Sequence, residues 1–352
     1  MIPRSAAVLA VAALAVASTP GGALAQDAGD AVARFYKGKA IELIIGSDVG
    51  GGYDTYSRVL ARHLGKHVPG NPNVVPKNLP GAGSQKAASY SYNVAPKDGT
   101  SIAALFSGAL VDPLLGEPKG PPQFDANKFV YLGSTNREVS VCIVGKASPA
   151  KTLKEAQANE ILVGASAAGG STRDFPLADN RLIGTKFHLV SGYPGTREIG
   201  LALERNEVAG ICGVYYSSMA SQYPDWKETG RVKPILQESL SGHPVLDAEK
   251  VPVLAKLAKP ADKAVVELIY GQLVFGRPYV LPPNTPAERA AALRKGFMDA
   301  LADPELLADA DKAKVEIRPV SGEEVQALIG RMYAAPPATV ARAKEILAGP
   351  KR

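Results

Sequence analysis

Short apolar strands alternate with amphipathic helices along this chain, and no other feature of the sequence restricts the fold as strongly. Strands are predicted at residues 40–46 and 73–78, with a helix at 54–67 between them. The alternation starts again at "VSVCIVGK" and continues to "VKPILQES", over residues 139–239. Strands that alternate with helices form largely parallel sheets with helices on their faces. The sequence therefore predicts the α/β class, with two units of mostly parallel sheet.

The two units are predicted to form two lobes with a cleft between them. No long linker separates the units, and the C-terminal part of the chain completes the first one. We place lobe 1 at residues 35–137 plus 240–352 and lobe 2 at residues 138–239. In the C-terminal part, "GQLVFGRPYVLP" (271–282) predicts a strand, and Thr285 is the predicted N-cap of the next helix.

Three predicted strand-to-helix turns share one design, in which small residues follow an apolar strand and precede a helix. The N-terminus of a helix presents unpaired N–H groups and the positive end of the helix dipole. Glycine lets a ligand approach that backbone, and parallel strands gather such turns at the carboxyl edge of a sheet. We therefore predict a site for a small carboxylate or phosphate, with ordinary caps and turns as the alternative. The candidate ligand-binding residues are Gly50, Gly51, Gly52, Tyr53, Asp54, Ser166, Ala168, Gly169, Gly170, Ser171, Thr172, Tyr193, Gly195 and Thr196.

Asp54 does not fit an anion site by itself, because its carboxylate repels a negatively charged ligand. We interpret it as a helix cap, a holder of water, or an acceptor for a ligand amine or hydroxyl group. The residues "YYSS" at 215–218 follow the strand "AGICGVY" and either line the cleft or close a loop.

The sequence contains no pattern typical of an enzyme, a nucleotide site or a metal site. The glycine turns lack the G-x-G-x-x-G and P-loop patterns, and G-x-S-x-G is absent. His63 and His67 have the i, i+4 spacing of metal ligands, but they lack H-E-x-x-H and are interpreted as a solvated helix face. His188 lies in a strand pattern and is predicted to be buried. We expect no catalysis, cofactor or metal.

The first 25 residues have the form of a cleavable secretory signal. Arg4 precedes an apolar stretch at 6–17, and Ala23-Leu24-Ala25 has the small-x-small form of a cleavage site. The stretch is too short for a permanent membrane span, so we expect a soluble protein exported to the periplasm. We also expect this protein to be a monomer. The net charge of +6 is spread without a dense basic block, which argues against nucleic acid as a partner.

Cys142 and Cys212 both lie in apolar runs that are predicted strands. We interpret them as buried, unpaired small side chains. An oxidising compartment also permits a disulfide between them, which is the alternative.

Several short motifs give the chain a resemblance to a known family. The motif P-G-G-x-x-D corresponds to "VGGGYD" at 49–54, with valine in place of proline. N-x-P-G-A-G corresponds to 78–83, P-x-D-G-T to 96–100, and Y-x-G to 193–195. With these motifs the chain resembles the extracytoplasmic solute receptors of tripartite tricarboxylate transporters, also called the Bug family. The second half of the chain differs more from the family's motifs, since the family's G-x-V-D is replaced by "NEVA" at 206–209.

The resemblance implies a type II periplasmic-binding-protein fold that holds a ligand carboxylate between its lobes, partly through water. It implies delivery of a di- or tricarboxylate, or a related organic acid, to a membrane permease. The first turn is then one wall of the site, and the second and third turns are the facing wall. Two alternatives stay open: a ligand-sensing subunit that docks on a membrane sensor kinase, and an exported enzyme that uses the same cleft.

Overall fold

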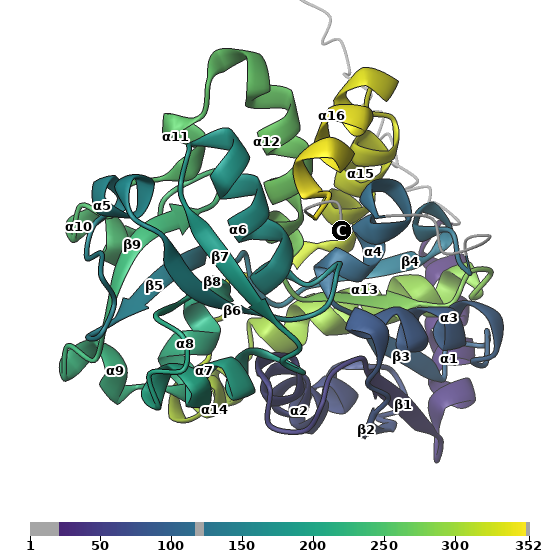
Figure 1. Cartoon of the computed structure of the whole chain (residues 1–352). Coiled ribbons are helices and arrows are strands. Elements are labelled where there is room, and N and C mark those ends of the chain that lie inside the picture. Colours follow the sequence, from purple (N-terminus) through teal and green to yellow (C-terminus); the bar gives the residue numbers. More distant parts are fainter. Residues whose placement is uncertain (1–20, 117–122, 350–352) are drawn as a thin grey trace, which may run out of the picture.

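The computed structural model describes residues 21–116 and 123–349. Most of the predicted secretory signal therefore lies outside the described residues. The described chain forms two β-sheets, with sheet B on the left and sheet A on the right of Figure 1. Sheet A has the strand order β11-β4-β10-β3-β1-β2, and sheet B has the order β7-β6-β8-β5-β9. The strands are β1 (Ala40–Ile45), β2 (Asn73–Asn78), β3 (Ser101–Ala104), β4 (Val130–Ser134), β5 (Ser140–Gly145), β6 (Ile161–Ala165), β7 (Phe187–Ser191), β8 (Gly210–Tyr215), β9 (Val232–Glu238), β10 (Pro278–Leu281) and β11 (Val320–Ser321).

Helices pack on both sheets, which confirms the predicted α/β class. The helices are α1 (Gly21–Tyr36), α2 (Gly52–Leu64), α3 (Gln85–Asn93), α4 (Ser107–Leu115), α5 (Leu153–Ala158), α6 (Ser171–Leu182), α7 (Thr196–Glu204), α8 (Tyr216–Gln222), α9 (Asp225–Glu228), α10 (Pro244–Ala248), α11 (Leu254–Leu257), α12 (Lys263–Tyr270), α13 (Ala287–Leu301), α14 (Pro304–Lys312), α15 (Gly322–Tyr333) and α16 (Pro337–Leu347). Helices α2 and α13 pack on sheet A, whereas α6 and α7 pack on sheet B. Among the described residues, no helix combines the length and the apolar character needed to cross a bilayer.

Both sheets contain antiparallel strands that the sequence patterns did not indicate: β10 and the edge strand β11 in sheet A, and β5 in sheet B. In sheet A, β10 runs antiparallel between β3 and β4, while β1 pairs in parallel with β2 and β3. In sheet B, β5 runs antiparallel between β8 and β9, while β6 pairs in parallel with β7 and β8. The reason is topological: β5 enters sheet B directly from the carboxyl end of β4, so it starts at the edge where β6 and β8 end.

Alternating side chains of the central strands fill cores on both faces of a sheet. In β5, Cys142 and Val144 belong to one buried cluster, whereas Val141 and Ile143 belong to another. This period of two is the normal geometry of a strand that is covered on both faces. The completely buried run of β5 therefore explains why no polar residue interrupts "VCIVG".

Cys142 and Cys212 form a disulfide bond between the neighbouring strands β5 and β8. Both side chains are completely buried. The interpretation of two unpaired thiols is therefore wrong, and the alternative of a bridge is confirmed. The antiparallel pairing of β5 with β8 brings the two cysteines together, and this pairing could not be inferred from their separate apolar runs.

Three local predictions differ from the structure. Only Pro278–Leu281 of the predicted strand at 271–282 is extended, because residues Gly271–Phe275 form a 3-10 helix. Thr285 is not a helix cap, since its hydroxyl donates to the carbonyl of Pro282 and the N-cap of α13 is Pro286. His188 is exposed rather than buried, because it lies on β7 at the edge of sheet B.

Candidate functional site

The carboxyl edges of the two sheets face each other, because the described chain passes between the sheets at these edges, from β4 to β5 and from β9 to β10. Ser107, at the start of α4, hydrogen-bonds to Tyr215 at the end of β8 through their hydroxyl groups, which lie 2.9 Å apart. A Cβ added to Gly108 would lie 2.7 Å from the carbonyl oxygen of Gly169. These contacts join a strand-to-helix turn of sheet A to turns of sheet B. We call this region the lobe interface.

The first predicted turn lies at the lobe interface, and Asp54 determines its shape. Gly50 has a φ of +82°, which favours glycine, and its N–H donates to Asp54 Oδ2 over 2.9 Å. Asp54 Oδ1 accepts hydrogen bonds from Arg58 Nε and Asn78 Nδ2, each over 2.9 Å. Burial alone would raise the pKa of Asp54, but these hydrogen bonds hold the pKa below its ordinary value. Asp54 thus stabilises the turn from inside α2, whose N-cap is Gly51.

Gly52 and Tyr53 bring the start of α2 against α8 of lobe 2 and against the segment before β10. A Cβ on Gly52 would lie 2.5 Å from Ser218 Oγ and 2.9 Å from Arg277 Nη1, so any larger residue would displace these groups. The Tyr53 hydroxyl donates to the Gly276 carbonyl over 2.5 Å. The N-terminus of α2 is therefore in direct contact with α8 and with the segment that precedes β10.

The second turn is held by side chains of its own helix, α6. Thr172 Oγ1 donates to Ser166 Oγ over 2.7 Å and accepts from the Ser166 N–H over 3.2 Å. The Gly169 N–H donates to Asp174 Oδ2 over 3.1 Å. Burial raises the pKa of Asp174 to about 6, although Arg173 opposes the shift. The turn is therefore fixed in place by internal hydrogen bonds.

Ser171 links the second turn to the interior of sheet B. Its hydroxyl donates to the Gly213 carbonyl over 2.6 Å, and the Gly213 N–H donates to Glu238 Oε2 over 2.6 Å. Gly170 is the N-cap of α6, whereas the Ala168 side chain is exposed. Five of the six candidate residues of the second turn thus have structural roles, and the sixth, Ala168, is exposed.

A pair of buried carboxyl groups, Asp179 and Glu238, lies behind the second turn. Both residues are 0% exposed, and their carboxyl groups lie close enough for the charge of one to affect the pKa of the other. Burial raises the pKa of Asp179 well above its ordinary value and raises the pKa of Glu238 to about 7. The Tyr270 hydroxyl donates to Asp179 Oδ1 over 2.8 Å. Two adjacent carboxylates are not both charged in an apolar interior, so the pair retains a proton.

The third turn lies beside the first. Gly195 is the N-cap of α7, Thr196 is its first residue, and Tyr193 packs half-buried against the core of sheet B. The next residue, Arg197, is exposed, and its Nη1 atom lies 3.6 Å from the position of a Cβ on Gly50. The structure therefore brings all three predicted turns to the lobe interface.

The sequence analysis missed two members of a buried polar cluster at the lobe interface, Glu138 and Arg277, and named the other two, Ser217 and Ser218, only as residues that line the cleft or close a loop. Arg277 Nε donates to Glu138 Oε1 over 2.7 Å, and both side chains are 1% exposed. Arg277 Nη2 donates to Ser217 Oγ and Ser218 Oγ over 2.9 and 2.8 Å. The guanidinium carbon lies 4.0 Å from the ring centre of Tyr56. We call Glu138, Ser217, Ser218 and Arg277 the junction cluster, because Glu138 and Arg277 lie in the two segments that cross between the sheets.

Two patterns in the sequence could have indicated further residues of the lobe interface. Arg277 stands inside the apolar run "LVFGRPYVL", and a charge in such a run is tolerated only when it is paired. The run "AALFSGALV" at 103–111 repeats the design of a strand, small residues and a helix, so it would have added Ser107 and Gly108 to the candidates.

His63 and His67 do not lie on a solvated face, and this prediction is wrong. His63 Nε2 lies 2.9 Å from Asp309 Oδ2, and His67 Nε2 lies 2.7 Å from Asp303 Oδ2, both on or next to α14. Lys66 Nζ lies 2.6 Å from the same Asp303 oxygen. The ammonium group supplies the positive charge that this carboxylate requires. We therefore interpret the cluster as an ion-pair network that holds α2 against α14.

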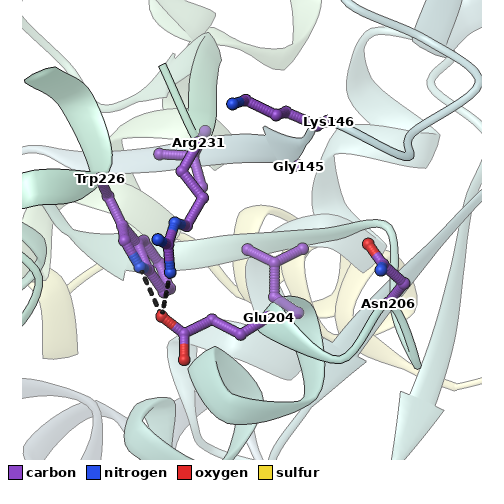
Figure 2. Close-up of a pocket in the computed structure, with 8 residues that line it drawn as sticks. Gly145, Lys146, Glu204, Asn206, Trp226 and Arg231 are labelled. Atoms are coloured by element: carbon purple, nitrogen blue, oxygen red, sulfur yellow. Dashed lines mark hydrogen bonds and ion pairs between the residues drawn. The ribbon is translucent and has the colours of Figure 1, made fainter. Parts of the chain in front are cut away.

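A hollow of about 250 Å³ lies at the other end of sheet B (Figure 2). Its wall includes Gly145 at the end of β5 and Val232 at the start of β9, both remote from the lobe interface. Glu204 accepts hydrogen bonds from Trp226 Nε1 over 3.0 Å and from Arg231 Nη1 over 3.1 Å. These polar groups satisfy one another, so the hollow does not compete with the turns as a candidate site.

The chain is similar to solved solute-binding proteins over most of its length. A TctC solute binding protein from Polaromonas is 22% identical, with a TM-score of 0.60 over 88% of this chain and 98% of that one. MatC from Rhodopseudomonas palustris, solved with malate, is 18% identical, with a TM-score of 0.67 over 88% and 99%. A further R. palustris protein, solved with adipate, is 18% identical, with a TM-score of 0.67 over 87% and 97%.

No family model and no curated protein sequence matches the chain. At these identities the similarity establishes architecture. Two helix-flanked sheets joined by two crossings match the solved binding proteins along nearly their whole length. The chain therefore has the two-lobed α/β fold of the periplasmic binding proteins.

Proposed function

We propose that this protein is an exported solute receptor that binds a small carboxylate between its lobes and delivers it to a membrane permease. The observation that carries the proposal is the arrangement of the turns. The N-termini of α2, α6 and α7 lie at facing carboxyl edges of two sheets, and each is preceded by glycine. Helix N-termini bind carboxylates through backbone N–H groups and the helix dipole.

The motifs and the fold together support membership of the Bug family of tripartite tricarboxylate transporter receptors. The two solved R. palustris proteins of the same fold hold malate and adipate, which are dicarboxylates. By this analogy the ligand is a di- or tricarboxylate or a related organic acid, the compartment is the periplasm, and the receptor acts as a monomer.

Binding by lobe closure requires that the two lobes move as bodies about the crossings. We place lobe 1 at residues 35–137 plus 240–352 and lobe 2 at 138–239, with hinges at the segments that hold Glu138 and Arg277. In the arrangement described here the turns of opposite lobes already touch. A ligand would enter when the lobes separate and would be released to the permease when they open again.

The test is a thermal-shift screen of the mature protein against mono-, di- and tricarboxylates, amino acids and neutral solutes. A compound that binds only the folded protein raises its melting temperature in a dose-dependent way. We expect a carboxylate to do so. If only amines or neutral solutes stabilise the protein, the fold stands and the carboxylate assignment fails.

A pair of glycine variants tests the location of the site. Gly52→Ala places a Cβ 2.5 Å from Ser218 Oγ and 2.9 Å from Arg277 Nη1, and so displaces both groups beside the N-terminus of α2. Gly330→Ala is the matched control, because nothing lies within 4 Å of a Cβ at this exposed position on α15. We expect Gly52→Ala to lose the ligand-induced shift and Gly330→Ala to retain it, with both variants folded by circular dichroism. Equal shifts in the two variants would place the ligand elsewhere.

A further inference from the structure

We infer that Arg197 pairs with a second anionic group of the ligand and makes the receptor prefer dicarboxylates to monocarboxylates. This inference rests on the proposed function, because it concerns the same site. Arg197 follows the third turn, on the sheet B side, and its guanidinium reaches the first turn, on the sheet A side. It is therefore a cation from one lobe that stands at the ligand-facing turn of the other.

The backbone that carries Arg197 is fixed. The Arg197 carbonyl accepts a hydrogen bond from the Tyr223 hydroxyl over 3.1 Å, and the Tyr223 ring stacks on Trp226 with ring centres 3.8 Å apart. Gly200 leaves room for this contact, because a Cβ there would lie 2.1 Å from the Tyr223 hydroxyl. The first turn of α7 is thus braced against the core of sheet B. From this position the Arg197 Nη1 atom lies 3.6 Å from the position of a Cβ on Gly50.

The charge of Arg197 is uncommitted, unlike that of the other arginines at the lobe interface. Arg58 is bound to Asp54, and Arg277 is bound to Glu138. Within residues 21–116 and 123–349, no carboxylate lies within ion-pair distance of the Arg197 guanidinium.

The acids around this region are Glu198 on α7, Asp48 before the first turn, and Asp54, whose carboxylate binds Gly50 and Arg58. None of them forms an ion pair with Arg197. An exposed, unpaired guanidinium that faces a conformationally restricted glycine turn is available to an anion. It is the position at which a second negative group of the ligand would be neutralised.

The geometry of a guanidinium explains the selectivity. Its N–H groups form a planar fork that binds a carboxylate through two parallel hydrogen bonds. A monocarboxylate that occupies the helix N-termini leaves this fork unpaired. A dicarboxylate gains the additional charge-assisted contact, provided that its second carboxylate reaches the rim beside Gly50.

The experiment compares succinate with butyrate, which share a four-carbon chain and differ by one carboxylate, by isothermal titration calorimetry. The variants are Arg197→Ala and Arg197→Lys, and Arg205→Ala is the matched control at the exposed far end of α7. We expect Arg197→Ala to weaken succinate binding on the order of tenfold or more and to change butyrate binding by less than about threefold. The succinate affinity of Arg197→Lys should lie between those of the wild type and Arg197→Ala, and the affinity of Arg205→Ala should match that of the wild type.

Three results would overturn the inference. In the first, wild-type protein and Arg197→Ala bind succinate equally well, which refutes the role of Arg197 and leaves the carboxylate receptor intact. In the second, Asp48→Asn weakens succinate binding as much as Arg197→Ala does, which shows that Arg197 acts through an ion pair with Asp48 across the lobe interface. In the third, the wild-type protein binds no carboxylate at all, so the proposed function fails together with the inference.

Discussion

Glu138→Gln is expected to cost about 3–5 kcal/mol in the free energy of unfolding, because it leaves a buried charge without its counter-ion. The substitution preserves the shape of the side chain. However, the Arg277 guanidinium, which is 1% exposed, would then be surrounded by an amide, hydroxyl groups and aromatic rings, none of which carries a negative charge. The ring of Tyr56, 4.0 Å from the guanidinium carbon, contributes at most about 2 kcal/mol as a cation–π partner. This contribution is too small to replace an ion pair that has been removed from water.

The measurement is urea-induced unfolding at pH 7 of the wild type, Glu138→Gln and a matched surface variant. Glu324→Gln is the control, since the Arg137–Glu324 pair has a 2.6 Å contact but side chains that are 40% and 46% exposed. Such a pair contributes about 1 kcal/mol or less. If Glu138→Gln unfolds within about 1 kcal/mol of the wild type, the ion pair does not hold the junction cluster together and the reasoning fails.

Two further predictions concern pH and the disulfide. The raised pKa of Glu238, about 7, means that the folded protein keeps a proton that the unfolded chain releases above its ordinary value of 4.5. Stability should therefore fall as pH rises from about 4.5 to about 7, and Glu238→Gln should flatten this slope in urea titrations at several pH values, whereas the exposed Glu228→Gln should not. The Cys142–Cys212 bridge closes a loop of 70 residues, so its reduction should cost roughly 4 kcal/mol. A reductant should lower the urea midpoint of the wild type and leave that of a double alanine variant unchanged; equal midpoints with and without reductant in the wild type would contradict this.

The positions of strands, helices and glycine turns could be predicted because they depend on local pattern. The strand at 73–78 coincides with β2, and the helix expected from residue 54 begins two positions earlier, at Gly52. All three predicted turns lie at the lobe interface, because helix N-termini that follow parallel strands share one edge. Asp54 could not be assigned a role from sequence, since one of its three partners is Asn78, which lies at the end of β2 and not in the same helix.

The sequence by itself determined the α/β class, the two units and the glycine-lined turns. Each of these features follows from the spacing of apolar residues and from the backbone freedom of glycine. The tertiary structure alone decided the antiparallel directions of β5 and β10, the disulfide, and the pairing of Glu138 with Arg277, which lies 139 residues away. These features depend on which distant segments become neighbours. That choice is made only when the chain crosses between its two sheets and buries its apolar faces together.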